Sequence, residues 1–221
     1  MAIAADDTGW SVACARPGDV LRRLGKCTLD EADHARAAGI SDETRHEHFI
    51  AGRALLRQRL SEQAGDTVQP ASWQFVHGTC GKPSVRPGLP QIPFSISHAA
   101  GLVAVATGPG PQIGIDLEHV TDIRTTGPVQ DQLTPREQAW LQRHSDADRW
   151  AAFLQLWTAK EAVSKALGLG CGLDFHDIEI DVPAGRARCP GGLLDTGDYM
   201  NFERHTITAH GAAYCLSVAC H

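Results

Sequence analysis

Two carboxylates stand on one short stretch that alternates in polarity, Ile-Gly-Ile-Asp-Leu-Glu at residues 113–118. Because successive side chains of a strand point to opposite faces, the three apolar residues face a core, while Gly114, Asp116 and Glu118 share the other face. Two carboxylates beside a glycine can form an all-oxygen site for a hard cation, and Mg²⁺ is the natural occupant. The alternative is an exposed strand edge that carries solubilising acids.

A second carboxylate lies in the stretch 157–169, WTAKEAVSKALGL, whose composition predicts a helix that Gly168 and Gly170 end. Glu161 and Lys165 fall one turn apart on the same side of this helix. The alternative is a surface helix with an ordinary Glu–Lys pair. Mg²⁺ is usually held by one or two carboxylates plus substrate phosphates, so the predicted substrate is phosphorylated. Its charge could be met by Arg53, Lys82, Arg86, Lys160 and Lys165.

The composition limits the classes of protein to which the chain can belong. The chain has 221 residues, of which 43% are hydrophobic and 21% charged, as in a globular protein of one large or two small domains. Its net charge of −6 argues against nucleic acid as a partner. No stretch resembles a membrane span or a signal peptide, and the seven scattered cysteines lack a CxxC pair. We therefore expect a cytoplasmic protein with reduced thiols.

Helices and strands are both expected, which predicts an α+β fold. One short helix is expected to begin near residue 29. Three further helices are expected over 42–63, 134–143 and 146–167. The expected strands are 9–16, 73–76, 94–98, 101–106, 113–118, 175–182, 205–209 and 214–219. Loops are expected at 78–89 and 119–132, and the Gly/Pro-rich stretch 107–112 is the expected boundary between two halves.

The two halves echo each other. Residues 93–106 and 204–219 both read as strand, short turn and strand, and each pair lies some forty residues after a long helix. Arg53 and Lys160 fall at equivalent places in these helices. A duplicated α+β unit would leave this pattern, with a ligand site in the cleft between the copies. We therefore expect an N-terminal half at 1–108 and a C-terminal half at 109–221.

Six motifs in order, AGRALLR, GKP, FSISH, GIDLE, LTPRE and WTAKEAVSKALGLG, give the chain a family resemblance. It resembles the 4′-phosphopantetheinyl transferase superfamily, in its longer single-chain (Sfp-type) class with a pseudo-two-fold fold. The resemblance implies a Mg²⁺-dependent enzyme that transfers the phosphopantetheine arm of coenzyme A to a serine of an apo carrier protein, with adenosine 3′,5′-bisphosphate as the other product. The carriers would belong to fatty-acid, polyketide, nonribosomal-peptide or siderophore synthases.

The resemblance also implies roles for single residues. Asp116, Glu118 and Glu161 look like the carboxylates around Mg²⁺, and Glu161, Lys165 and His98 like the catalytic residues. Arg53 and the turn at Lys82 and Pro83 resemble the part that holds the adenine and 3′-phosphate end, so the N-terminal half would contribute to coenzyme A binding. The implied cofactor-binding residues are Arg45, Arg53, Lys82, Pro83, Ser97, His98, Lys160 and Lys165.

The sequence departs from the family pattern in two places. His48 stands four residues before Gly52, where many members carry arginine, and the segment after Glu118 lacks the aromatic-rich helix often found there. Two other functions remain open: a Mg²⁺-dependent hydrolase of coenzyme A or a nucleotide pyrophosphate, and a non-catalytic module that binds coenzyme A or a carrier. Because two fused halves supply the paired surface within one chain, we expect a monomer.

Overall fold

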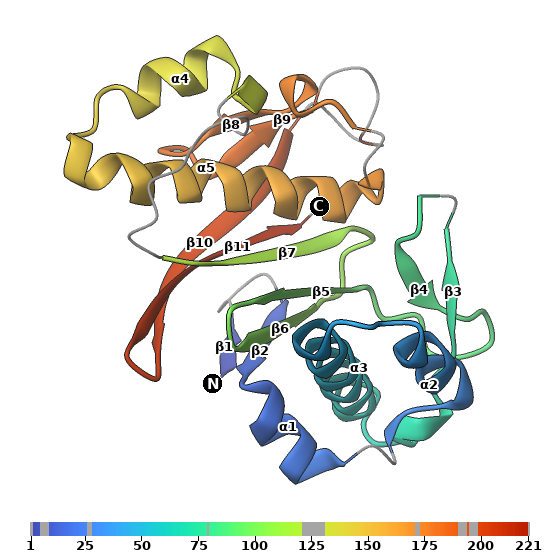
Figure 1. Cartoon of the computed structure of the whole chain (residues 1–221). Helices are drawn as coiled ribbons and strands as arrows, with labels where there is room; N and C mark the ends of the chain where they lie inside the picture. The colour runs from blue at the N-terminus through green and yellow to red at the C-terminus, as the bar shows by residue number, and fades with distance from the viewer. Residues whose placement is uncertain are drawn as a thin grey trace. The chain divides into compact units, whose positions relative to one another are not determined.

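The computed structural model describes residues 2–4, 9–25, 28–78, 80–120, 131–170, 173–189, 194 and 199–220 (Figure 1). The chain divides into two compact units, Met1–Pro111 and Gln112–His221. The division falls inside the stretch 107–112 where the sequence predicts a boundary. Each unit combines helices with an antiparallel sheet, so the predicted α+β class is confirmed.

The N-terminal unit is built on a four-stranded antiparallel sheet and a long helix. The strand order is β1 (Ala2–Ala4), β2 (Ser11–Ala15), β6 (Leu102–Thr107) and β5 (Phe94–Ala99). The helices are α1 (Pro17–Leu24), α2 (Glu31–Ala38), α3 (Glu43–Gln63) and the short 3₁₀ helix η2 (Pro70–Ser72). A small hairpin of β3 (Phe75–His77) and β4 (Pro83–Val85) lies beside α2 (Figure 1).

Helix α3 begins close to its predicted start and packs through an apolar face. The Asp42 side chain accepts a hydrogen bond from the backbone N–H of Arg45 at 2.7 Å, which caps the first turn. Leu55, Leu56 and Leu60 are buried in the core of this unit together with Trp73. The helix therefore owes its place to an apolar face packed in the core beneath β5 and β6.

The C-terminal unit is a five-stranded antiparallel sheet with one long helix against it. The strand order is β7 (Ile113–His119), β11 (Ala212–Cys220), β10 (Tyr199–Ala209), β9 (Arg186–Arg188) and β8 (Glu179–Asp181). The helices are α4 (Pro135–Leu141), α5 (Asp146–Leu167) and the short 3₁₀ helix η5 (Phe175–Asp177). Helix α5 runs along the sheet (Figure 1).

Local signals set the ends of both helices in this unit. Thr134 and Glu137 form a capping box at the start of α4. Ser145 caps α5, which ends at Gly168 in the left-handed conformation with φ of 71°. The predicted bounds of α5 are therefore confirmed.

The predicted internal repeat is present in the topology. In each unit a short helix precedes the long one, and a hairpin follows whose second strand pairs with a strand that comes before these helices: β2–β6–β5 matches β7–β11–β10. Arg53 and Lys160, at equivalent places, are both buried. Each contacts a carboxylate of the preceding short helix, Asp33 at 3.3 Å and Glu137 at 2.9 Å.

Some elements differ from the predictions. Strand β2 ends just before Pro17, as expected, but Pro17 and Gly18 then open helix α1, which was not predicted; proline at the first helical position suits a helix start. Strand β4 lies inside the expected loop 78–89, and β9 was not predicted at all. Within the expected loop 119–132, residues 121–130 lie outside the described residues. No helix in the described part of the chain is long and apolar enough to cross a membrane.

Candidate active site

A single glycine lets α5 lie directly on strand β7. A Cβ atom placed on Gly114 would lie 2.5 Å from the backbone nitrogen of Ala166 and closer still to the carbonyl oxygen of Ala162. Both atoms belong to the backbone of α5, so no side chain could move aside. The face of β7 that carries Asp116 is therefore covered by α5, and the alternative of a solvated strand edge is wrong.

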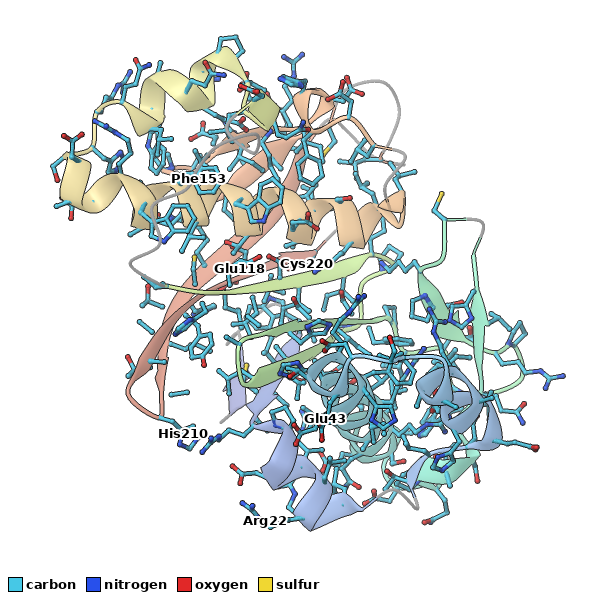
Figure 2. The ribbon with its side chains drawn as sticks, in the orientation of Figure 1. Arg22, Glu43, Glu118, Phe153, His210 and Cys220 are labelled. Carbon is cyan, nitrogen blue, oxygen red and sulfur yellow. The ribbon has the colours of Figure 1, made fainter. Side chains whose placement is uncertain are left out.

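This close approach brings the predicted residues of the strand and the helix together. Asp116 is 5% exposed and pairs in register with Ser217 of β11. The Nζ atom of Lys165 lies 2.5 Å from Oδ1 of Asp116, which joins α5 to β7. Glu118, labelled in Figure 2, lies on the side of β7 that faces α5. Glu161 stands one turn before Lys165 on α5.

Crowding of the carboxylates changes their acidity. Burial, followed by the negative charge of Asp116, raises the pKa of Glu118 to about 7, and Glu161 adds to the effect. Burial and Asp116 also raise the pKa of Glu161. Lys165 opposes both shifts, and a hydrogen bond from the Trp157 side chain opposes the shift at Glu118. Without another cation the site therefore holds more negative charge than it compensates.

This excess of carboxylate oxygen suits a hard cation. Among the described residues, no three Asp, Glu, His or Cys side chains already converge on one metal position, so Asp116, Glu118 and Glu161 do not form a complete metal cage by themselves. Mg²⁺ does not need one, because it usually binds one or two carboxylates and completes its shell with waters and substrate phosphates. The donor set therefore fits Mg²⁺ with a phosphorylated substrate.

A small cavity opens beside Glu161. Its volume is about 260 Å³. Trp157 contributes one wall, and its ring meets Phe175 edge-on with centroids 5.3 Å apart. Ser164 and Leu173 line it as well. The cavity offers mainly apolar surface next to a carboxylate, which suits an uncharged, elongated part of a substrate.

Lys160 belongs to the interior of the C-terminal unit. It is fully buried, and its Nζ lies 2.9 Å from Oε2 of Glu137. It also donates to the carbonyl oxygens of Phe175 at 2.7 Å and Ile178 at 2.6 Å. An ammonium group has three protons, and these three contacts use them. The predicted contact of Lys160 with coenzyme A is therefore wrong, and the residue has a structural role.

Arg53 lies at the wall of a larger cavity in the N-terminal unit. The cavity measures about 760 Å³ and lies between α2 and β3, with Arg36, Arg86 and His77 around it. Arg53 is 5% exposed, and its guanidinium carbon lies 4.9 Å from the ring centroid of Phe75. Within the described part of the chain its Nη1 atom has no hydrogen-bond partner. A buried guanidinium with an unused donor is suited to an anionic ligand.

Arg57, one turn after Arg53 on α3, is structural. It is fully buried and contacts Asp33 at 2.6 Å and Asp30 at 2.7 Å. It also donates to the carbonyl oxygen of Trp73 at 2.6 Å. Arg45 is exposed at the start of α3.

The remaining predicted residues of the N-terminal unit do not share the cavity of Arg53. Lys82 and Pro83 line a separate cavity of about 210 Å³, and burial lowers the pKa of Lys82 to about 8. Ser97 is buried on β5, and His98 is exposed at the end of that strand.

Two carboxylates that the sequence did not predict as partners hold the buried cations. Asp33 contacts Arg53, and Glu137 contacts Lys160. A signal was available. Asp33 lies 20 residues before Arg53, and Glu137 lies 23 residues before Lys160, so both halves place an acid in the short helix upstream of the long one.

Comparison with known proteins gives a consistent picture. The profile of the 4′-phosphopantetheinyl transferase superfamily matches residues 112–219. The chain is 31% identical over 177 residues to the 4′-phosphopantetheinyl transferase HetI of Nostoc sp. (strain PCC 7120), an alignment that covers 77% of this chain and 72% of HetI. It is 33% identical over 133 residues to the 4′-phosphopantetheinyl transferase gsp of Aneurinibacillus migulanus, covering 60% of this chain and 53% of gsp.

Among solved structures, a Chronobacterium ammoniagenes ACPS–CoA complex aligns with a TM-score of 0.35 at 19% identity. That alignment covers 50% of this chain and 96% of the other.

Proposed function

Because the chain belongs to the 4′-phosphopantetheinyl transferase superfamily, we propose that it transfers the 4′-phosphopantetheine arm of coenzyme A to a serine of an apo carrier protein. Adenosine 3′,5′-bisphosphate is the other product. One observation carries the proposal: Asp116, Glu118, Glu161 and Lys165 gather between β7 and α5, inside the region that the family profile matches.

The metal proposal follows from the donor chemistry of that site. Asp116 and Glu118 on β7 and Glu161 on α5 would hold Mg²⁺. When bound, Mg²⁺ supplies charge neutralisation to the pyrophosphate group of the donor. Asp116 is fixed by its place in the sheet and by Lys165, so one ligand is held rigidly before substrate arrives.

Glu161 is the proposed general base. A serine hydroxyl is a weak nucleophile until a nearby group takes its proton. A base works best when its pKa lies close to the working pH, and the pKa of Glu161 is raised towards that range by burial and by Asp116. Lys165 is half-buried, so its ammonium group can also meet phosphoryl oxygens as negative charge develops on them.

The N-terminal unit is proposed to bind the nucleotide end of coenzyme A. The unused Nη1 donor of Arg53, in a cavity that also has Arg36 and Arg86 at its walls, supports a phosphate ligand there. Phe75 also lines this cavity, and its ring packs against the Arg53 guanidinium. Contacts of the donor with Arg45, Lys82, Pro83, Ser97 and His98 stay predictions from the family resemblance.

The finer assignments are proposals as well. We propose a cytoplasmic monomer that activates carrier proteins of fatty-acid or secondary-metabolite synthases. Sedimentation at low concentration checks the oligomeric state, and a tight homotrimer would contradict it.

Incubation with coenzyme A, Mg²⁺ and a set of apo carrier proteins tests the function. Intact mass spectrometry should show one phosphopantetheine added per carrier domain. A hydrolase would consume coenzyme A and leave the carriers unchanged, and a non-catalytic module would leave both unchanged. Either of these two outcomes overturns the proposal.

A further inference from the structure

Helix α3 crosses strand β5 at close range in the N-terminal unit. A Cβ atom on Gly52 would lie 3.3 Å from Cγ2 of Ile96, so the helix backbone rests on the strand there. One turn earlier on α3 stands His48, and two residues later on β5, on the same face, stands His98. The crossing therefore sets these two histidines against each other.

The two imidazole rings are stacked. Their centroids lie 5.2 Å apart and their planes differ by 3°. His48 is 7% exposed, whereas His98 is exposed at the end of its strand. The buried ring of His48, in the second turn of α3, has its orientation fixed by packing, and it gives the exposed ring of His98 a fixed surface to lie against. Because the two rings are stacked, the fixed plane of the His48 ring favours one plane for the His98 ring.

We propose that His48 is a positioning residue that fixes the ring plane of His98. The inference rests on the proposed function, in which His98 contacts the phosphate groups of coenzyme A. His98 then presents the edge of its imidazole, with its nitrogen atoms, to the ligand, because its face is occupied by His48. The burial of His48 argues against a direct contact of its own with the ligand.

This role gives a reason for the departure from the family pattern at position 48. A long cation there could reach a phosphate by itself, but a buried imidazole cannot. Its available contribution is the flat surface that holds a neighbouring ring. Removing one member of an aromatic pair changes an equilibrium constant on the order of 2- to 10-fold, which sets the scale of the expected effect.

Three variants of the full chain test the proposal: His48→Ala, His48→Phe and, as a matched control, His46→Ala on the same helix. Calorimetry measures coenzyme A binding, and steady-state kinetics separate KM from kcat. We expect His48→Ala to weaken binding and raise KM by about 2- to 10-fold with kcat nearly unchanged. His48→Phe keeps a ring for stacking and should restore wild-type values, and His46→Ala should not differ from wild type.

Proton NMR of the free protein gives a second readout that does not depend on coenzyme A. Stacking places the His98 ring protons in the ring current of residue 48, so their chemical shifts should move in His48→Ala and stay displaced in His48→Phe. If His48→Ala fails to fold in a thermal melt, His48→Gln replaces it as the variant without a ring.

The proposal is overturned if the Ala and Phe variants bind coenzyme A equally, or if the His98 shifts do not respond to loss of the ring. A wild-type chain that neither binds coenzyme A nor modifies a carrier would instead refute the proposed function, and the NMR measurement would still decide whether His48 orders His98.

Discussion

Replacing Gly114 by alanine should separate the two elements that carry the site. The new Cβ would lie 2.5 Å from the nitrogen of Ala166 and closer to the oxygen of Ala162, whereas real Cβ contacts below 3.0 Å are essentially never seen. Reaching an ordinary contact of 3.4 Å at Ala166 requires a shift of 3.4 − 2.5 = 0.9 Å, and the closer approach to Ala162 requires more. Because backbone blocks the methyl group, α5 or β7 must move as a whole.

The cost follows from this geometry. Overpacking usually costs about 1–3 kcal/mol, and a clash with backbone belongs at the upper end of that range. For a chain of this size, about 3 kcal/mol corresponds to a fall of roughly 6–12 °C in Tm. A displacement of about 1 Å between reacting groups can reduce a rate on the order of 100-fold. We therefore expect Gly114→Ala to be less stable than the wild type. We also expect its folded molecules to transfer phosphopantetheine more slowly.

Thermal and urea denaturation followed by circular dichroism measure the stability, and carrier mass measures the rate. Gly18→Ala is the matched control, because its Cβ would meet only Oε1 of Glu47 at 3.8 Å. A Gly114→Ala protein with wild-type Tm and wild-type transfer rate would refute the close packing of α5 on β7.

Three further predictions concern charge. Because folding raises the pKa of Glu118 from 4.5 to about 7, its protonated form stabilises the fold at low pH and that contribution is lost as pH rises through about 7. Mg²⁺ requires the deprotonated form, so the increase in Tm on adding Mg²⁺ should be larger at pH 8 than at pH 6; equal increases would contradict this. Arg53→Ala should reduce the preference for coenzyme A over dephospho-coenzyme A by roughly 10- to 100-fold in calorimetry, since one charge-assisted contact is worth about 1.5–3 kcal/mol. Unchanged preference would place the 3′-phosphate elsewhere. Lys160→Met should lower the free energy of unfolding in urea by about 3–5 kcal/mol, because it leaves the buried Glu137 without its cation. A Lys160→Met protein that is as stable as the wild type but binds coenzyme A more weakly would show instead that Lys160 contacts coenzyme A.

The elements that could be predicted are those whose signals, such as capping residues and terminal glycines, lie at their own ends in the sequence. The bounds of α5 follow from Ser145 at its start and Gly168 at its end, and α4 follows from its capping box at Thr134 and Glu137. Strand β9 has three residues, too few for a pattern of polarity to stand out. Helix α1 has a proline that favours equally a turn and a helix start.

The candidate site was predictable in its residues and not in their surroundings. Alternation on β7 and the helical period of α5 place Asp116, Glu118, Glu161 and Lys165 on matching faces. The burial of Lys160 could not be read in the same way, because it depends on Glu137 from another helix and on carbonyl groups near η5. Contacts of this kind are set by tertiary packing, which a pattern within one element does not encode.

Glu161→Gln tests most directly the central claim that this carboxylate between α5 and β7 performs the transfer. Glutamine keeps the shape of the side chain and one oxygen, but loses the base and one negative charge. The measurement is the intact mass of an apo carrier protein after incubation with coenzyme A, Mg²⁺ and either enzyme, with coenzyme A binding checked by calorimetry. We predict a carrier that stays unmodified by Glu161→Gln while coenzyme A still binds. Near-normal addition of phosphopantetheine by Glu161→Gln at ordinary Mg²⁺ would contradict the claim.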